Sequence, residues 1–214
     1  MSHLTKEQID LYNRDGFIAP IDIYSREEAA AIRQELEGLE ASYPEAVTGR
    51  NRNNVHYVTS LFDKIVHNPD ILDAVETLVG KDFLVGGTTL FIKEPEQRGF
   101  ISWHHDARYI GLEPENWVTA WLALSDVTTE NGCMYMWPGS HLERAREHLD
   151  TFDEENLLTR GQLFKMFQQT IQFQLHSKQV NYPYTTRGLS TALAIIAPKA
   201  VELASLFSHT SGQT

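Results

Sequence analysis

A histidine and an aspartate two positions apart are the residues of this sequence best suited to hold a metal ion. They are His104 and Asp106, within the strand-like segment W-H-H-D at 103–106. Because successive side chains of a strand point to opposite faces, His104 and Asp106 share one face and His105 points to the other. One imidazole, one carboxylate and a distant second histidine make the facial triad that leaves positions open on Fe(II). The tripeptide alone is too short to establish such a site.

Further motifs surround this pair. In chain order they are L-T-K-E-Q-I at 4–9, D-G-F-I at 15–18, L-F-I-K-E-P at 90–95, W-H-H-D-A-R-Y at 103–109, W-V-T-A-W-L-A-L-S-D-V at 117–127, E-N-G-C-M at 130–134 and W-P-G-S-H at 137–141. Together they resemble the phytanoyl-CoA dioxygenase (PhyH) family of Fe(II)/2-oxoglutarate-dependent oxygenases. The resemblance covers residues 4–162 and is far more specific than the tripeptide.

The resemblance implies a fold and a set of site residues. The fold is α+β, mainly β: a double-stranded β-helix, or cupin-like jelly roll, with N-terminal helices. By match to the family motifs, His104 and Asp106 are expected to bind iron, and Lys93 and Trp121 to lie near the 2-oxoglutarate pocket. Tyr109 is expected to line the substrate side. For Trp121, a role as an aromatic residue of the barrel core is equally compatible. No residue is assigned a separate catalytic role.

The implied function is a dioxygenase that uses Fe(II), 2-oxoglutarate and O2 to hydroxylate a small organic molecule. Asp106 favours hydroxylation, because related halogenating enzymes have a small residue at this position. A noncatalytic β-sandwich binding module, or a degenerate dioxygenase without metal, stays open as an alternative. A zinc hydrolase using His104, His105 and Asp106 is a third hypothesis, which the divergence of adjacent strand side chains disfavours.

The order of the predicted elements is helices first and strands afterwards. Capping patterns predict a helix from Thr5 to near Gly16, one from Ser25 that stops before Pro44, and one from Asn68 to Gly80. A short strand is predicted at Phe17–Ile21 and a polar loop at 45–58. Further strands are predicted at 83–85, 88–92, 101–104, 117–122 and 133–137, spaced as in a sandwich or barrel. Asn131-Gly132 and Pro138-Gly139 are turn signals, and His141, directly after the second, is expected to be structural.

The composition changes at Gln162. Residues 163–214 contain four Lys or Arg and one Asp or Glu, so they carry +3, whereas residues 1–162 carry -14. We therefore predict a dioxygenase-like domain at 1–162, helical over 1–80 and β from 82, and an atypical tail at 163–214. The family's distal histidine, in an H-G-S-like segment, and an arginine further on are both missing from the tail. The later histidines, His141, His148, His176 and His209, lack that context.

A change of reading frame would account for the tail. Residues 177–193 can be translated back into their possible codons and read again from the third base of each codon. In this shifted frame, the possible bases allow the segments H-H and then H-G-S, in the family order. In the same frame, the codons of residues 201 and 202 allow R-R. We infer that 163–214 is a frame-shifted tail. The β core is then expected to be incomplete at the C-terminus, and this form of the protein to be inactive.

The overall composition describes one globular domain and excludes some partners. The 214 residues are 42% hydrophobic and carry a formal charge of -11, which disfavours nucleic acid and anionic membranes. The single cysteine, Cys133, cannot form an internal disulfide. The N-terminal segment has no basic region followed by an apolar run, so we expect a cytoplasmic protein.

Overall fold

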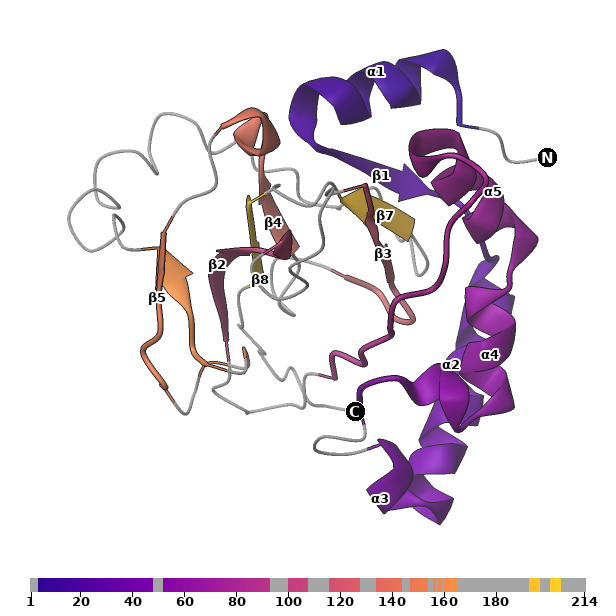
Figure 1. The fold of residues 1–214 in the computed structure, drawn as a ribbon. Coiled ribbons are helices and arrows are strands. Elements are labelled where there is room, and N and C mark those ends of the chain that lie inside the picture. The colour runs from indigo at the N-terminus through magenta and orange to yellow at the C-terminus, as the bar shows by residue number, and fades with distance from the viewer. Residues whose placement is uncertain are drawn as a thin grey trace, which may run out of the picture.

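The structure of this chain is a computed structural model. It describes residues 4–47, 52–92, 100–107, 116–127, 134–143, 147–153, 156, 158, 160–164, 193–196 and 201–204. The helices gather on one side of the molecule and the strands on the other (Figure 1). The helices, which come mainly first in the chain, are therefore also separated in space from most of the strands.

The three predicted helices are present, and local signals explain their ends. Helix α1 (Lys6–Asp15) begins with a capping box in which Thr5 and Gln8 each bond the other's backbone N–H, and it ends at Gly16. Helix α2 (Arg26–Ser42) begins with the same arrangement between Ser25 and Glu28. Helix α5 (Pro69–Val79) has Asn68 as its N-cap and a proline in its first turn. Each cap satisfies N–H groups that the helix leaves without a partner.

Two stretches differ from the sequence-based predictions. The predicted loop contains helix α3 (Pro44–Val47) and the 3-10 turn η2 (Val55–Tyr57), and helix α4 (Ser60–Val66) follows it. Helix α4 forms because Leu61 and Phe62 are buried with Leu36 of α2. The strands predicted at 83–85 and 88–92 are wrong, since this stretch makes only one isolated bridge, from Thr89 to Asn53.

The strands form two three-stranded antiparallel sheets and a small hairpin-like pair. One sheet has the order β1 (Phe17–Ile21), β7 (Leu193–Ile196), β3 (Thr119–Leu122). The other has the order β2 (Ile101–His105), β8 (Val201–Ala204), β4 (Met134–Trp137). Strands β5 (His148–Leu149) and β6 (Leu163–Phe164) pair with each other. Two segments of the atypical tail, β7 and β8, thus hold the middle position of each sheet.

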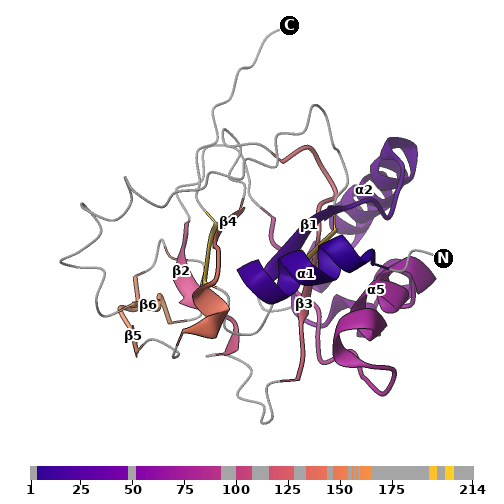
Figure 2. The same cartoon turned by 90° about the horizontal axis from the view of Figure 1, so that it is seen from above.

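Apolar side chains join the two sheets and attach the helices. Phe17 of β1 packs with Met134 and Met136 of β4, so the sheets face each other, and Trp121 of β3 lies against this cluster. Tyr12 of α1 contacts the same cluster and also a second one formed by α1, β1 and α5. Figure 2 shows α1 beside β1.

The W-P-G-S-H segment, at the end of β4, forms hydrogen bonds with the last turn of α1. The Gly139 N–H donates to the Asp15 carbonyl at 2.9 Å, and the His141 Nε2 lies 3.1 Å from the Asn13 carbonyl. His141 belongs to the 3-10 turn η3 (Ser140–Leu142). Gly16 has φ +86°, and a Cβ there would collide with the His141 ring. His141 therefore has the structural role that its position after a turn predicted.

Candidate metal centre

His104 and Asp106 come together as strand alternation predicted. The His104 Nε2 lies 3.4 Å from the Asp106 Oδ1, and the His104 side chain is almost fully buried. His104 is the fourth residue of β2, and Asp106 follows the last. The two donor atoms are close enough to bind one ion, with a nitrogen and an oxygen of the types that suit iron.

A backbone carbonyl orients the His104 ring. The His104 Nδ1 lies 2.9 Å from the carbonyl oxygen of Ser102. Because a carbonyl can only accept, Nδ1 must carry the hydrogen, and the neutral ring then has its lone pair on Nε2, the atom beside Asp106. A metal-binding histidine is commonly held in this way by its second nitrogen.

The Asp106 carboxylate has a separate partner for each oxygen. Its Oδ2 accepts a hydrogen bond of 2.5 Å from the Thr119 hydroxyl, while Oδ1 faces His104. Burial by itself would raise the pKa of Asp106, but its neighbours His104, the Thr119 hydroxyl and His105 together hold that pKa below its usual value. Asp106 is therefore ionised at neutral pH, as a metal ligand must be.

Buried polar groups support the strand that carries His104. The Ser102 hydroxyl donates to the carbonyl of Gln162 and accepts a bond of 2.9 Å from the Asn156 side-chain amide. All three residues are buried. The Gln162 side chain in turn donates to the Asp150 carboxylate. The last residues before the change in composition thus anchor β2.

His105 lies on the other face of β2. Its ring meets that of His148 edge-on, with ring centroids 5.3 Å apart, and its backbone N–H donates to the His148 Nε2 at 3.3 Å. Among the described residues, no three His, Cys, Asp or Glu side chains form a group that could hold a metal. His104 and Asp106 thus fit two positions of a facial triad, and the described part of the chain supplies no third.

The other predicted site residues are only partly described. Trp121 lies between the sheets against the cluster of Phe17, Met134 and Met136. Lys93 and Tyr109, like His176 and His209, lie outside the described residues. Sequence reasoning missed Thr119, Ser102 and Asn156. A hydroxyl within the otherwise apolar W-V-T-A-W segment was the one available signal for Thr119, and nothing in the sequence indicated Asn156.

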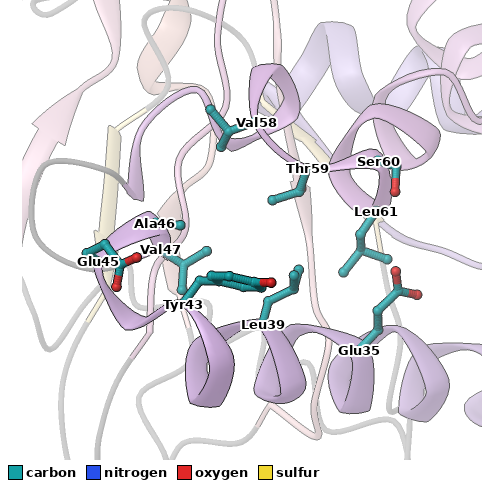
Figure 3. Close-up of a pocket in the computed structure, with 10 residues that line it drawn as sticks. All are labelled: Glu35, Leu39, Tyr43, Glu45, Ala46, Val47, Val58, Thr59, Ser60 and Leu61. Atoms are coloured by element: carbon teal, nitrogen blue, oxygen red, sulfur yellow. The ribbon is translucent and has the colours of Figure 1, made fainter.

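A cavity lies among the helices. It has a volume of about 420 Å³ and is formed by α2, α3, α4 and the residues Val58 and Thr59 before α4, as Figure 3 shows. Apolar side chains, among them Leu39, Val47 and Leu61, line it, with Glu35 and Glu45 at its edge. It contains none of the predicted site residues. In the described residues, no helix combines the length and apolar character needed to cross a membrane.

Two curated proteins are similar to this chain in sequence. "Phytanoyl-CoA dioxygenase domain-containing protein 1" of Mus musculus is 31% identical over 99 residues, which are 46% of this chain and 34% of that protein. "Ectoine dioxygenase" of Halomonas elongata is 28% identical over 154 residues, which are 64% of this chain and 46% of that protein. The chain thus spans less than half the length of these relatives.

A solved structure shares the fold. The non-heme alpha ketoglutarate dependent carbocyclase SnoK, from nogalamycin biosynthesis, superposes with a TM-score of 0.67 at 22% identity, over 97% of this chain and 80% of that one. The sequence profile of the family "Phytanoyl-CoA dioxygenase (PhyH)" matches residues 12–162, which include both predicted ligands and end at Gln162. The chain therefore belongs to the phytanoyl-CoA dioxygenase family.

Proposed function

We propose that the chain is an Fe(II)/2-oxoglutarate-dependent dioxygenase by ancestry, one that hydroxylates a small organic molecule. The observation that carries this proposal is the pairing of the His104 Nε2 with the Asp106 Oδ1, 3.4 Å apart at the C-terminal end of β2. The Ser102 carbonyl turns the histidine lone pair toward the site. Membership of the family supplies the reaction class, and the names of its relatives include dioxygenases.

His104 and Asp106 would hold the metal. Bound iron with 2-oxoglutarate supplies the power to oxidise an unactivated C–H bond. The protein's own residues keep the imidazole in one tautomer, keep the carboxylate ionised, and leave only 5% of the His104 side chain and 18% of the Asp106 side chain exposed. Because Asp106 fills the position at which halogenating relatives have a small residue, hydroxylation is the favoured outcome.

The remaining roles follow the family motifs. Lys93 and Trp121 contribute to the 2-oxoglutarate pocket, and Tyr109 lines the substrate side. The position of Trp121 between the two sheets suits either a pocket wall or a core residue. The partners are 2-oxoglutarate, O2 and a small-molecule substrate. With residues 163–214 as they stand, the distal histidine and arginine are missing from the motif, so we expect weak iron binding and little turnover.

Anaerobic Fe(II) titration in the presence of 2-oxoglutarate tests this function. The chain should develop a visible charge-transfer band, and His104→Ala and Asp106→Ala should each abolish it. His67→Ala is a matched control, because this exposed histidine lies at the end of α4 and bonds to Asp63. Zinc should give no band. If the unaltered chain gives no band at any iron concentration, the binding-module alternative replaces this proposal.

A further inference from the structure

We infer that Thr119 is a positioning residue that holds the Asp106 carboxylate in the orientation needed for metal binding. This inference rests on the proposed function and names a residue that the family motifs did not single out. The Thr119 hydroxyl bonds the Asp106 Oδ2 at 2.5 Å, whereas the Asp106 Oδ1 is the atom that faces the His104 Nε2 at 3.4 Å. The two carboxylate oxygens therefore have different tasks.

The direction of this hydrogen bond is settled by chemistry. An ionised carboxylate can only accept, so the Thr119 hydroxyl must be the donor. A carboxylate binds a metal ion in its ionised form, so this is the state in which Asp106 would act as a ligand. A bond from a neutral donor to a charged acceptor is stronger than one between neutral groups. It removes Oδ2 from competition for the ion and leaves Oδ1 as the single metal-binding oxygen.

Thr119 belongs to a regularly paired strand of the other sheet. It is the first residue of β3, and β3 pairs with β7 without irregularity from Thr119 to Leu122. Asp106 follows β2, which lies in the facing sheet. The hydrogen bond therefore spans the two sheets at the site. Because threonine is branched at Cβ, it has few side-chain rotamers, so its hydroxyl is held in place before the ion arrives.

A residue that orients a metal ligand typically changes metal affinity by about 10–100-fold when it is removed. Without the Thr119 hydroxyl, the Asp106 carboxylate can rotate and turn either oxygen toward the ion. We expect weaker binding and a change in the ligand geometry around the metal. The fold should change little, because valine has nearly the shape of threonine.

The test compares Thr119→Val with Thr119→Ser by anaerobic Fe(II) titration with 2-oxoglutarate. Thr119→Val should raise the apparent Kd for Fe(II) by about 10–100-fold and shift the charge-transfer band. Thr119→Ser keeps the hydroxyl and should restore most of the affinity. Thr77→Val is the matched control, because the Thr77 hydroxyl on α5 bonds only the Asp73 carbonyl of its own helix among the described contacts. Urea unfolding of each variant measures whether the fold is retained.

Three results would overturn the inference. Equal Fe(II) affinity in the unaltered chain and Thr119→Val would remove the positioning role and leave the proposed function standing. A loss in Thr119→Ser as large as that in Thr119→Val would assign the effect to the methyl group, and hence to packing. If the unaltered chain binds Fe(II) no better than His104→Ala does, the proposed function fails and the inference fails with it.

Discussion

At the residue scale, the candidate site depends on two residues with hydroxyl groups, Ser102 and Thr119, that hydrogen-bond to the metal-binding pair or to the groups around it. Ser102 shows this most directly, because its carbonyl orients His104 while its hydroxyl bonds Asn156 and Gln162. The two functions belong to different atoms of one residue. Substitution of the side chain should therefore separate the stability of the fold from the affinity of the site.

Ser102→Ala should reduce the free energy of unfolding by about 1–3 kcal/mol, since it leaves the Asn156 amide and the Gln162 carbonyl buried without this partner. Urea unfolding measures the loss. Because the Ser102 carbonyl remains, Fe(II) affinity should fall far less than in His104→Ala. Ser42→Ala, at the exposed end of α2, should change stability by less than about 0.5 kcal/mol. An unchanged unfolding free energy in Ser102→Ala would contradict the role of this hydroxyl.

Tyr12 makes the fold sensitive to alkaline pH. It packs against two apolar clusters, and burial raises its pKa from 10.0 to about 12. The folded chain holds this proton to higher pH than the unfolded chain does, so the stability from neutral Tyr12 is complete below pH 10 and is lost as pH rises toward 12. Between about pH 9 and about pH 11.5, the free energy of unfolding of Tyr12→Phe should therefore fall less than that of the unaltered chain. Urea unfolding at each pH measures both.

The matched control for that measurement is Tyr57→Phe. Tyr57 is 73% exposed and packs in neither apolar cluster, so removal of its hydroxyl should leave the alkaline loss of stability unchanged. Parallel pH dependence in the unaltered chain and Tyr12→Phe would show that burial of Tyr12 does not control this transition.

The proximity of His104 and Asp106 could be predicted because one residue lies in β2 and the other directly follows it. His104 and Asp106 share a face because of the two-residue period of β2, and that period can be read locally. Thr119 and Asn156 reach the site from positions 13 and 54 residues away from their partners. No local pattern encodes such contacts, so they emerge only when the sheets face each other.

At the element scale, the helices were predictable because their caps are local. Thr5, Ser25 and Asn68 each bond N–H groups within three residues, so the signal and the structure lie in the same segment. The strands predicted at 83–85 and 88–92 failed for the opposite reason. Their residue types suit strands, but a strand needs a partner, and this stretch makes only a single bridge. Leu84 and Phe91 are instead exposed.

The junction between α1 and η3 offers a sharp test at this scale. Gly16→Ala should destabilise the fold by about 1–3 kcal/mol through backbone strain, because φ of +86° disfavours alanine. The collision of the new Cβ with the His141 ring should add to this loss. Gly38→Ala is the control, since Gly38 lies within α2 with no neighbour that a Cβ would meet. It should stabilise the fold by about 0.4–1 kcal/mol. Thermal unfolding of the two variants should move in opposite directions, and a shared direction would contradict the tight junction.

At the scale of the whole molecule, residues 163–214 provide the middle strand of both three-stranded sheets. Strand β7 lies between β1 and β3, and β8 lies between β2 and β4. In β8, position 202 is the register partner of His104 and position 201 that of His105. The family profile ends at Gln162, before either strand begins. The identity of the residues at these positions therefore decides what stands beside the metal-binding pair.

We propose that the codons of residues 163–214 are read in a shifted frame, and this is testable in two steps. Resequencing of the DNA from the codon of Gln162 through that of Thr214 should reveal a neighbouring frame that encodes H-H, H-G-S and R-R in order. The protein expressed in that frame gains a distal histidine and an arginine that can pair with the second carboxylate of 2-oxoglutarate. It should bind Fe(II) with 2-oxoglutarate at least about tenfold more tightly than this chain does in the same titration. If no such string is encoded, the tail is genuine, the triad has no recognisable third ligand, and the degenerate form without metal becomes the better account of the molecule.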